Sequence, residues 1–409
     1  MKNQQKQNNK RRDFIKKGVA GIAGLSVFPS AGAITSQTSD RSATVENRII
    51  YRTLGRTGYK VPIVSMGSST NEYIIKASLK KGIKLIDTAY IYGKGLDETT
   101  IGAATAGLPR DSFIIASKVY GLRDNNTGMP LENITPEEFK DDFRKSVDTS
   151  LKRLRLDYLD ILFLHAADNP ELVKMDMVKD VLKELKNEGK TKFIGVSTHT
   201  NSVIYSIVEE EIYDVILIGY NFRDEETGEG HRAIEHAANA GCGIIGMKSL
   251  GGVFWDEERK QRINQSAAAK WIMQDENVHT TIFTMNNFGQ LEMYMSLMND
   301  PEFTPEDRKE LRLGEPNVST GLYCNQCETC IPQCPYGMDV PKLMRSYMYA
   351  YAYNKPAKAK ETLSLLHNKG LLCTDCVGGC TVNCPMGFDV RRKISDITRI
   401  MDVPDEFLV

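Results

Sequence analysis

The cysteines of this chain are concentrated in one short stretch, where they form a repeat. Eight of the nine cysteines lie between residues 324 and 384. Their spacing is C-x2-C-x2-C-x3-C-P in the first run and C-x2-C-x3-C-x3-C-P in the second. Thiolates spaced this closely are soft ligands that surround one face of an iron–sulfur cluster. The sequence therefore predicts two 4Fe-4S clusters, with these metal ligands: Cys324, Cys327, Cys330, Cys334, Cys373, Cys376, Cys380 and Cys384.

Two other uses of eight cysteines compete with clusters. An exported protein could form four disulfides, and C-x2-C pairs could bind zinc. Neither use predicts two four-cysteine runs that each end in Cys-Pro. The segments that begin at these last cysteines, CPYGMDV and CPMGFDV, are also similar to each other. In two-cluster ferredoxins the cysteine before proline binds the other cluster. This rule predicts two crossed sets, Cys324, Cys327, Cys330 and Cys384 for one cluster and Cys373, Cys376, Cys380 and Cys334 for the other.

The segment between the two cysteine runs has helical character. Residues 340–353 and 357–367 both show apolar periodicity typical of helices. A compact β-type ferredoxin has a shorter insert, and this arrangement resembles the all-helical two-cluster ferredoxin module fused to many oxidoreductases. We therefore expect residues 319–409 to form a small, mainly helical ferredoxin-type domain, preceded by a linker helix in residues 301–318.

The first 48 residues differ from the rest. Residues 1–17 hold seven Lys/Arg, and Arg11-Arg12-Asp13-Phe14-Ile15-Lys16 resembles a twin-arginine export signal. An uncharged stretch follows, with an A-x-A cleavage site at residues 31–33. Its Gly and Pro residues make it a poor match to the roughly 20 apolar residues of a spanning helix. We expect residues 1–33 to be a signal peptide and 34–48 a linker, with a basic tail or short anchor as the alternative.

This signal implies a partner and a location. The twin-arginine export machinery carries folded proteins, so clusters could be loaded before export to the periplasm or cell exterior. The formal net charge of −1 gives no bulk attraction to nucleic acid or to a membrane surface. We therefore expect no nucleic-acid partner and no stable membrane span. The ninth cysteine, Cys242, lies in an apolar segment and is expected to be a buried small residue.

Residues 49–300 alternate short apolar runs with longer amphipathic stretches, such as the helical patterns at 137–153 and 172–187. Alternation of this kind implies parallel strands joined by right-handed crossovers. Eight such units predict a closed (β/α)8 TIM barrel, whose chemistry lies at the C-terminal ends of its strands. An open doubly wound sheet is the alternative, but no G-x-G-x-x-G follows an early strand. The predicted strands are residues 62–67, 83–89, 113–119, 158–165, 192–197, 215–220, 243–248 and 280–284.

Several segments of this barrel resemble the aldo/keto reductase family, in family order over roughly residues 50–298. They include YRTLGRTG at 51–58, GIKLIDTAYIYG at 82–93, LRLDYLDILFLH at 154–165 and GKTKFIGVS at 189–197. The resemblance implies a catalytic tetrad of Asp87, Tyr92, Lys118 and His165.

The tetrad suits the reduction of a carbonyl. A phenol with a pKa near 10 can donate a proton to a developing alkoxide at neutral pH. Lys118, held by Asp87, would lower the pKa of Tyr92, and His165 would orient the carbonyl oxygen. Taken singly, each residue has a structural explanation: a turn cap for Asp87, surface packing against Tyr90 for Tyr92, solvation for Lys118 and core packing for His165.

The expected nucleotide site departs from the family pattern. Positions that usually hold a Ser-Asn pair, a Gln and an aromatic read Ser197-Thr198, Leu217 and Met247. Asn286-Asn287 stands where NADP-preferring members often place a cation. A loop with Lys248 and two glycines would still cradle phosphates through its charge and its backbone N–H groups. If NAD(P) binds, the predicted contacts are Ser197, Lys248, Gly251, Gly252 and Asn286.

The leading hypothesis is an exported iron–sulfur oxidoreductase that acts on a carbonyl, alcohol or sugar-like substrate, with Tyr92 as acid/base and a redox partner protein. A nicotinamide passes a hydride, whereas each cluster passes one electron, and no flavin motif is visible to connect them. One alternative is an electron-transfer subunit whose barrel is a non-catalytic scaffold. Another is a cytoplasmic reductase with an N-terminal tail.

Overall fold

The computed structural model describes residues 49–126, 131, 133–224, 228–314, 322–366, 373–374, 376 and 379–408. Residues Asn47–Val409 form one compact unit. The predicted signal peptide at 1–33 and the linker at 34–48 lie outside the described residues. No helix in the described ranges has the length and apolar character needed to cross a membrane.

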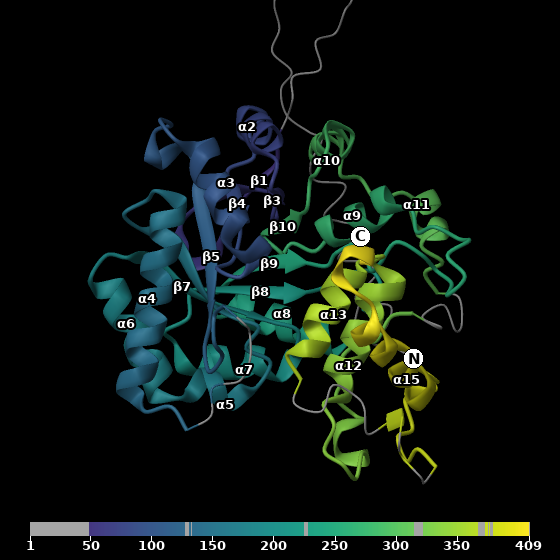
Figure 1. The fold of residues 1–409 in the computed structure, drawn as a ribbon. Coiled ribbons are helices and arrows are strands. Elements are labelled where there is room, and N and C mark those ends of the chain that lie inside the picture. The colour runs from purple at the N-terminus through teal and green to yellow at the C-terminus, as the bar shows by residue number, and fades with distance from the viewer. Residues whose placement is uncertain are drawn as a thin grey trace, which may run out of the picture. The chain divides into compact units, whose positions relative to one another are not determined.

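Eight parallel strands close into a barrel in the order β10-β3-β4-β5-β6-β7-β8-β9 (Figure 1). β10 pairs with both β3 and β9, so the sheet has no open edge and the predicted (β/α)8 barrel is confirmed. Each strand overlaps one of the eight predicted runs. The strands are β3 (Val64–Met66), β4 (Leu85–Asp87), β5 (Ile114–Tyr120), β6 (Leu159–His165), β7 (Thr191–Thr198), β8 (Val215–Gly219), β9 (Gly243–Met247) and β10 (Thr280–Phe283).

Amphipathic helices surround the barrel. α4 shows how the sequence forms one, because Thr135 and Glu138 make a capping box and Phe139, Phe143 and Val147 form its buried stripe. The helix predicted at 172–187 is instead two helices, since Met175 has an extended backbone with ψ of 126°. The helices are α2 (Glu72–Lys80), α3 (Leu96–Thr105), α4 (Pro136–Leu154), α5 (Pro170–Lys174), α6 (Asp176–Asn187), α7 (Asn201–Glu210), α8 (Glu229–Asn239), α9 (Gln265–Met273) and α10 (Phe288–Asn299).

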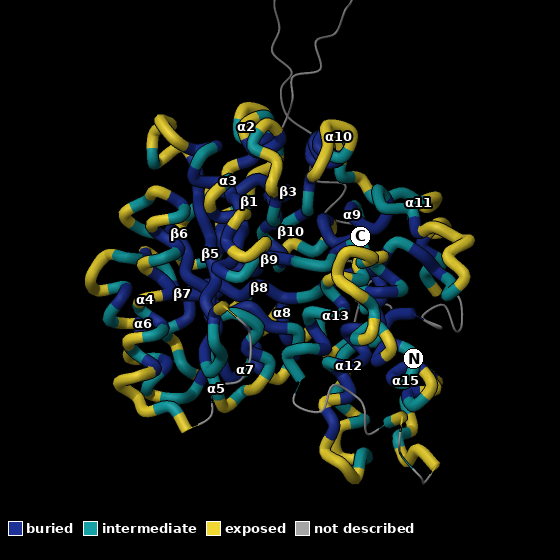
Figure 2. Tube along the Cα trace, in the orientation of Figure 1, coloured by how far each residue is buried: buried dark blue, intermediate teal, exposed yellow. Residues whose placement is uncertain are grey.

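The barrel interior is filled with apolar side chains. Figure 2 shows the strands as a buried centre with helices whose outer faces are exposed. A hairpin of β1 (Tyr51–Thr53) and β2 (Lys60–Pro62) contributes Leu54 and Val61 to the interior cluster. Cys242 is buried in the main core, as predicted. The interior is therefore a packed core, and the C-terminal ends of the strands remain as the place for a site.

The C-terminal region is mainly helical, as predicted. It contains α12 (Val340–Tyr347), a π-helical turn η5 (Met348–Ala352), α13 (Pro356–Ser364) and α15 (Val390–Thr398), while α11 (Pro305–Glu310) precedes it. β8 and β9 point toward α12 and α13 (Figure 1). Phe254, from the loop after β9, belongs to the apolar core of this region, and the Val253 amide donates to the Ala352 carbonyl at 2.7 Å. The helical region therefore packs on the barrel.

Candidate active site

The four predicted tetrad residues lie at the C-terminal ends of neighbouring strands. Asp87 ends β4, Lys118 lies in β5 and His165 ends β6, while Tyr92 begins the short turn η2 (Tyr92–Gly95) after β4. Lys118 Nζ is 2.5 Å from Asp87 Oδ2, and the Lys118 side chain is 1% exposed. This buried ion pair does not fit the interpretation of Lys118 as a solvated strand end.

Tyr92 lies against both Lys118 and His165. Lys118 Nζ is 4.9 Å from the centroid of the Tyr92 ring, and the Tyr92 and His165 rings meet edge-on at 5.8 Å. Tyr90 makes different contacts, since its hydroxyl hydrogen-bonds to Asn126 Oδ1 at 2.8 Å. The structure thus brings the four predicted residues together and leaves the neighbouring tyrosine outside the group.

Two buried polar atoms of this group lack a hydrogen-bond partner among the described residues, namely Asp87 Oδ1 and His165 Nδ1. The His165 ring stacks on Tyr120 at 4.5 Å, so its orientation is fixed by packing. Buried polar atoms are normally paired, and exceptions mark places where water or a ligand completes the bonding. Asp87 and His165 are therefore arranged as parts of a binding site.

Burial controls the protonation of the group. It raises the pKa of Tyr92 well above 10, and the Asp87 carboxylate raises it further. The lowering of the Tyr92 pKa expected from Lys118 does not appear in the net shift, which burial and the neighbouring acidic groups set. Burial also holds the pKa of His165 well below 6.5. At neutral pH Tyr92 keeps its proton and His165 is uncharged.

A cavity of about 480 Å³ lies above the tetrad, within the size range of small-molecule sites. Asp87 and Tyr92 contribute to its wall. The helical C-terminal region supplies another part of the wall, which sequence reasoning missed. Only the run of tyrosines and lysines at 347–358, in a segment with no cysteine, was available as a signal. The residues from this region are Tyr349, Tyr353, Lys355, Lys358 and Glu361.

The five predicted nucleotide contacts do not stay together. Lys248, Gly252 and Asn286 line the cavity. The Ser197 hydroxyl instead accepts a hydrogen bond from the Ala166 amide at 2.9 Å. The Gly251 carbonyl accepts one from Arg223 Nε at 2.9 Å. Three of the five positions are therefore placed to meet a ligand in the cavity, while Ser197 and Gly251 are engaged within the protein.

Lys248 is half-buried, and no ion pair with a carboxylate is found for it among the described residues. Its Nζ is 2.8 Å from His199 Nε2 and 4.6 Å from the centroid of the Tyr349 ring. Burial lowers its pKa well below 10.5. Its backbone has a φ of +55°, a left-handed conformation that is strained for a residue other than glycine and is common at functional sites. Lys248 is therefore held at the cavity wall by the fold.

The eight clustered cysteines form two groups. Burial raises the pKa of the Cys330 thiol to about 12, with further increases from Cys324, Cys327 and Cys384. It raises the pKa of Cys373 to about 11, with further increases from Cys334, Cys380 and Cys376. These groups have the same members as the two crossed sets predicted from the Cys-Pro repeat, although ligation itself stays a prediction.

Disulfides and zinc are the two alternatives to iron–sulfur clusters for these cysteine groups. The nine cysteines form no disulfide in this structure. Among the described residues, no three His, Cys, Asp or Glu side chains are placed to hold a single metal ion. A four-iron cluster spaces its thiolates more widely than one zinc ion does. One cavity is lined by the four cysteines of the second set, Cys334, Cys373, Cys376 and Cys380. Each of the two sets would hold one cluster.

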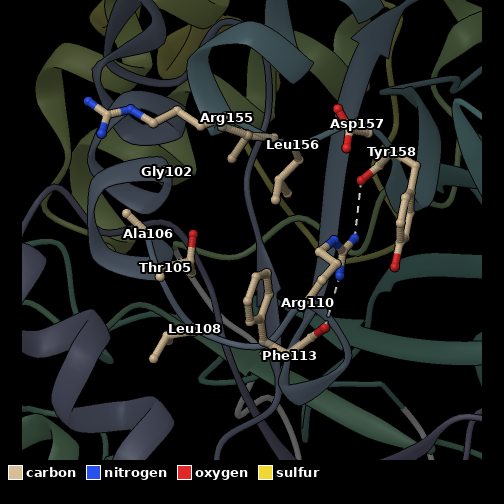
Figure 3. A pocket seen from close by; sticks show the side chains of 12 residues that line it. Gly102, Thr105, Ala106, Leu108, Arg110, Phe113, Arg155, Leu156, Asp157 and Tyr158 are labelled. Carbon is tan, nitrogen blue, oxygen red and sulfur yellow. Dashed lines mark hydrogen bonds between the residues drawn. The ribbon is translucent and has the colours of Figure 1, made fainter.

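A second hollow lies at the opposite end of the barrel, before β5 and β6 (Figure 3). Of the two arginines that line it, Arg110 and Arg155, the first already binds the carbonyls of Phe113 and Tyr158 and the Asp160 carboxylate. In barrels of this kind the N-terminal ends of the strands serve stability. The hollow therefore offers no competing site.

Two family models match the chain. The aldo/keto reductase family matches residues 64–268, and a 4Fe-4S dicluster domain matches residues 323–389. Among solved structures, an aldo-keto reductase from Bacillus halodurans has a TM-score of 0.54 at 21% identity, over 65% of this chain and 96% of that chain. One from Klebsiella pneumoniae in complex with NADPH has a TM-score of 0.51 at 19% identity, over 65% and 95%. At these identities the structural likeness shows the fold alone.

Curated relatives match over shorter lengths. L-galactose dehydrogenase of Arabidopsis thaliana is 33% identical over 168 residues, 37% of this chain and 49% of the relative. D-threo-aldose 1-dehydrogenase of a Pseudomonas species is 28% identical over 187 residues, 42% of this chain and 57% of the relative. The chain thus spans about half the length of these two relatives.

Proposed function

Since the chain belongs to the aldo/keto reductase family and also contains a 4Fe-4S dicluster domain, we propose that it is an iron–sulfur oxidoreductase acting on a carbonyl or alcohol. The observation that carries this proposal is the grouping of Tyr92, Lys118, Asp87 and His165, of which Asp87 and Tyr92 line a cavity large enough for a small molecule. Tyr92 is the proposed acid/base.

Each tetrad residue has a role in this proposal. Tyr92, protonated at neutral pH, donates its proton to the oxygen of a reduced carbonyl, or accepts one in the reverse direction. The Lys118 ammonium, 4.9 Å from the ring, stabilises the phenolate that forms, and Asp87 holds Lys118 in place. His165 is uncharged and fixed by its stacking on Tyr120, so it orients the carbonyl oxygen without transferring charge.

The cavity supports a polar, sugar-like substrate. Two tyrosines, Tyr349 and Tyr353, and two lysines, Lys355 and Lys358, line it beside Tyr92. Aromatic faces with polar edges and cationic groups suit a molecule rich in hydroxyl groups. The relatives from Arabidopsis thaliana and Pseudomonas bear the names of sugar dehydrogenases, L-galactose dehydrogenase and D-threo-aldose 1-dehydrogenase, which agrees with this substrate class.

We propose NAD(P) as the hydride carrier. The cavity extends from Tyr92 to Gly252 and Asn286, and the Klebsiella pneumoniae neighbour is described in complex with NADPH. When bound, a nicotinamide supplies a hydride, and the clusters supply or accept single electrons toward a redox partner protein. Lys248 and the Gly252 backbone are the groups of this chain placed to contact such a ligand.

One observation favours the second candidate, an electron-transfer subunit with a non-catalytic barrel. Ser197 and Gly251 are engaged within the protein, and Lys248 Nζ contacts His199. These contacts leave fewer groups free to hold a nucleotide than the resemblance implied.

A titration separates the two candidates. The protein, purified anaerobically with its clusters, is titrated with NADPH and with NADH while nucleotide fluorescence and cluster absorbance are followed. We expect one nucleotide to bind and to support reduction of a short aldose. If neither nucleotide binds, the reductase proposal is contradicted and the electron-transfer subunit is favoured.

Export by the twin-arginine route to the periplasm or cell exterior remains part of the proposal. It rests on the pattern in residues 1–33, which includes Arg11 and Arg12. A fusion of the chain to a reporter should be exported, and replacing both arginines by lysine should retain it in the cytoplasm. Unchanged export of the double-lysine variant contradicts the proposal.

A further inference from the structure

The two halves of the cysteine repeat share their local construction. After each Cys-Pro, a glycine adopts positive φ, +61° at Gly337 and +70° at Gly387. An aspartate then caps the following helix: Asp339 accepts from the Lys342 amide at 3.1 Å and Asp389 from the Arg392 amide at 3.0 Å. A difference between the halves is therefore a difference in side chains on one common frame.

That difference appears six residues after each capping aspartate. The first half has Arg345 there, and the second half has Ser395. Arg345 is buried, at 6% exposure, and its Nε and Nη2 donate to Gln326 Oε1 at 3.1 and 2.8 Å. Gln326 lies between Cys324 and Cys327 in the sequence. Arg345 thus contacts a residue inside the first predicted cluster-binding run.

On its other side Arg345 reaches the barrel. Its Nη1 donates to Asp168 Oδ2 at 2.8 Å, just beyond the end of β6. Asp168 Oδ1 accepts from the His199 amide at 2.8 Å and lies 3.1 Å from His199 Nδ1, while His199 Nε2 contacts Lys248 at the cavity wall. An unbroken series of contacts therefore joins the first cysteine run to the cavity: Gln326, Arg345, Asp168, His199 and Lys248.

Other residues near the two cysteine runs contact different parts of the molecule. Glu328, in the first run, lies 3.4 Å from Thr200 of the barrel, and the Tyr323 hydroxyl accepts from Asn221 Nδ2 at 2.5 Å. In the second run, Thr381 donates to the Gln333 carbonyl at 2.6 Å. Arg391 donates to the Cys376 carbonyl at 2.5 Å. These two bonds stay inside the C-terminal region, whereas those of Glu328 and Tyr323 reach the barrel. The second half meets the barrel elsewhere, through Arg392 and Lys393, which pair with Glu257 in the loop after β9 at 3.1 and 2.5 Å.

The buried Arg345–Asp168 ion pair is not explained by a contribution to the stability of the fold. Two buried charges lose their hydration, and apolar residues of similar volume often stabilise a fold as well or better. Although burial raises the pKa of Asp168, Arg345 and His199 hold it well below 3.8, so the carboxylate is charged. A permanent charge pair therefore lies beside the first cysteine run.

We propose that Arg345 is a positioning residue that couples the first cysteine site, formed by Cys324, Cys327, Cys330 and Cys384, to the barrel cavity through Asp168 and His199. In the second half the corresponding residue is Ser395, whose side chain carries no charge for such a pair, and the barrel contact runs instead from Arg392 and Lys393 to Glu257, away from the cavity wall. The inference rests on the proposed function in one respect, that clusters are bound. Charge and hydrogen bonding near the sulfurs set the reduction potential of a cluster, so Arg345 should raise the potential of the first cluster alone.

The test measures the two potentials separately. The holoprotein is titrated potentiometrically under argon and followed by electron paramagnetic resonance. Cys327→Ser and Cys380→Ser, each at an exposed predicted ligand of one set, show which signal belongs to which cluster. We expect Arg345→Gln to lower the potential of the first cluster by at least a tenfold change in its one-electron equilibrium, about 59 mV. The second cluster should not move.

Two further variants sharpen the test. Arg391→Gln is the matched control, because Arg391 lies beside the second site, and it should move only the second potential. Asp168→Asn removes a negative charge from the barrel side and should raise the first potential. Asp168→Asn also carries the test if Arg345→Gln fails to fold.

Two results would overturn the inference. Clusters present with a first potential unmoved by Arg345→Gln and Asp168→Asn contradict the coupling while leaving the proposed function intact. A holoprotein without clusters contradicts both.

Discussion

The barrel site and the cysteine sites are built in opposite ways. The tetrad sits on strand ends and a tight turn, and its central ion pair between Lys118 and Asp87 is formed by the fold alone. The cysteines lie on loops and short turns, and Cys327 and Cys380 are exposed. Burial, and after it the neighbouring thiols, raise the pKa of Cys330 and Cys373, so deprotonation of these ligands is unfavourable until a positive metal neutralises the charge.

This difference teaches which site depends on a bound group. The fold bears the desolvation cost of the buried Lys118–Asp87 pair before any ligand binds, as preorganised catalytic sites do. The cysteine region has the reverse dependence, since its binding groups are unfavourably placed without their cluster. The contacts of Arg345 and Tyr349 join the barrel, whose site forms without a bound group, to the cysteine region, whose sites depend on a cluster.

The largest effect should come from removing the clusters. We expect chelation of iron under oxidising conditions to unfold the loops around Cys324–Cys334 and to loosen α12 and α15, because cluster binding energy is folding energy for such loops. Amide hydrogen exchange should rise there and remain slow in β5 and β6. Equal loss of protection in barrel and C-terminal region would contradict the comparison.

Breaking the barrel ion pair should cost less but still be large. Lys118→Met leaves Asp87 buried without its partner, and we expect the free energy of unfolding to fall by about 3–5 kcal/mol. The double variant Lys118→Met with Asp87→Asn should recover much of that loss. Urea denaturation followed by far-ultraviolet circular dichroism measures both, and a double variant as unstable as the single one contradicts the explanation.

The stabilities linked to Asp97 and Asp168 should depend on pH in opposite senses. Burial raises the pKa of Asp97 to about 7, above its unfolded value near 4. The stability linked to Asp97 is thus full below about pH 4 and is lost as pH rises through about 7. We expect Asp97→Asn to gain about 1–3 kcal/mol over wild type at pH 8 relative to pH 4. Asp168→Asn should change in the opposite sense, because its folded pKa is depressed.

The smallest effect tests the wall supplied by the C-terminal region. Tyr349→Ala removes one face of the cavity and leaves all four tetrad side chains unchanged. We expect KM for an aldose to rise about tenfold, equivalent to 1.4 kcal/mol, with kcat within about twofold. Tyr351→Ala, on the same turn but absent from the cavity wall, serves as the control. Equal effects of the two variants would show that the wall does not bind substrate.

The sequence predicted the barrel well because its signal is local. Each strand is a short apolar run that periodicity locates, whereas the tetrad at the strand ends was implied by the resemblance to the aldo/keto reductase family. The cavity wall could not be predicted, since nothing local reveals that Tyr349 and Lys358 would dock over Tyr92. Arg345 and Asp168 are 177 positions apart and meet only through tertiary packing. The raised pKa of Tyr92 could not be predicted either, because its main cause is burial, which is a property of the assembled fold.

The central claim is that Tyr92 carries the chemistry of this cavity. Its most direct test compares kcat/KM for anaerobic, NADPH-driven aldose reduction by wild type, Tyr92→Phe and Tyr90→Phe. Tyr90 is the matched control, since it is two residues away and hydrogen-bonds to Asn126 instead of facing the tetrad. We expect Tyr92→Phe to lose about 10²–10⁴-fold and Tyr90→Phe to stay within about twofold. Tyr92→Phe that reduces the aldose as fast as wild type would contradict the account.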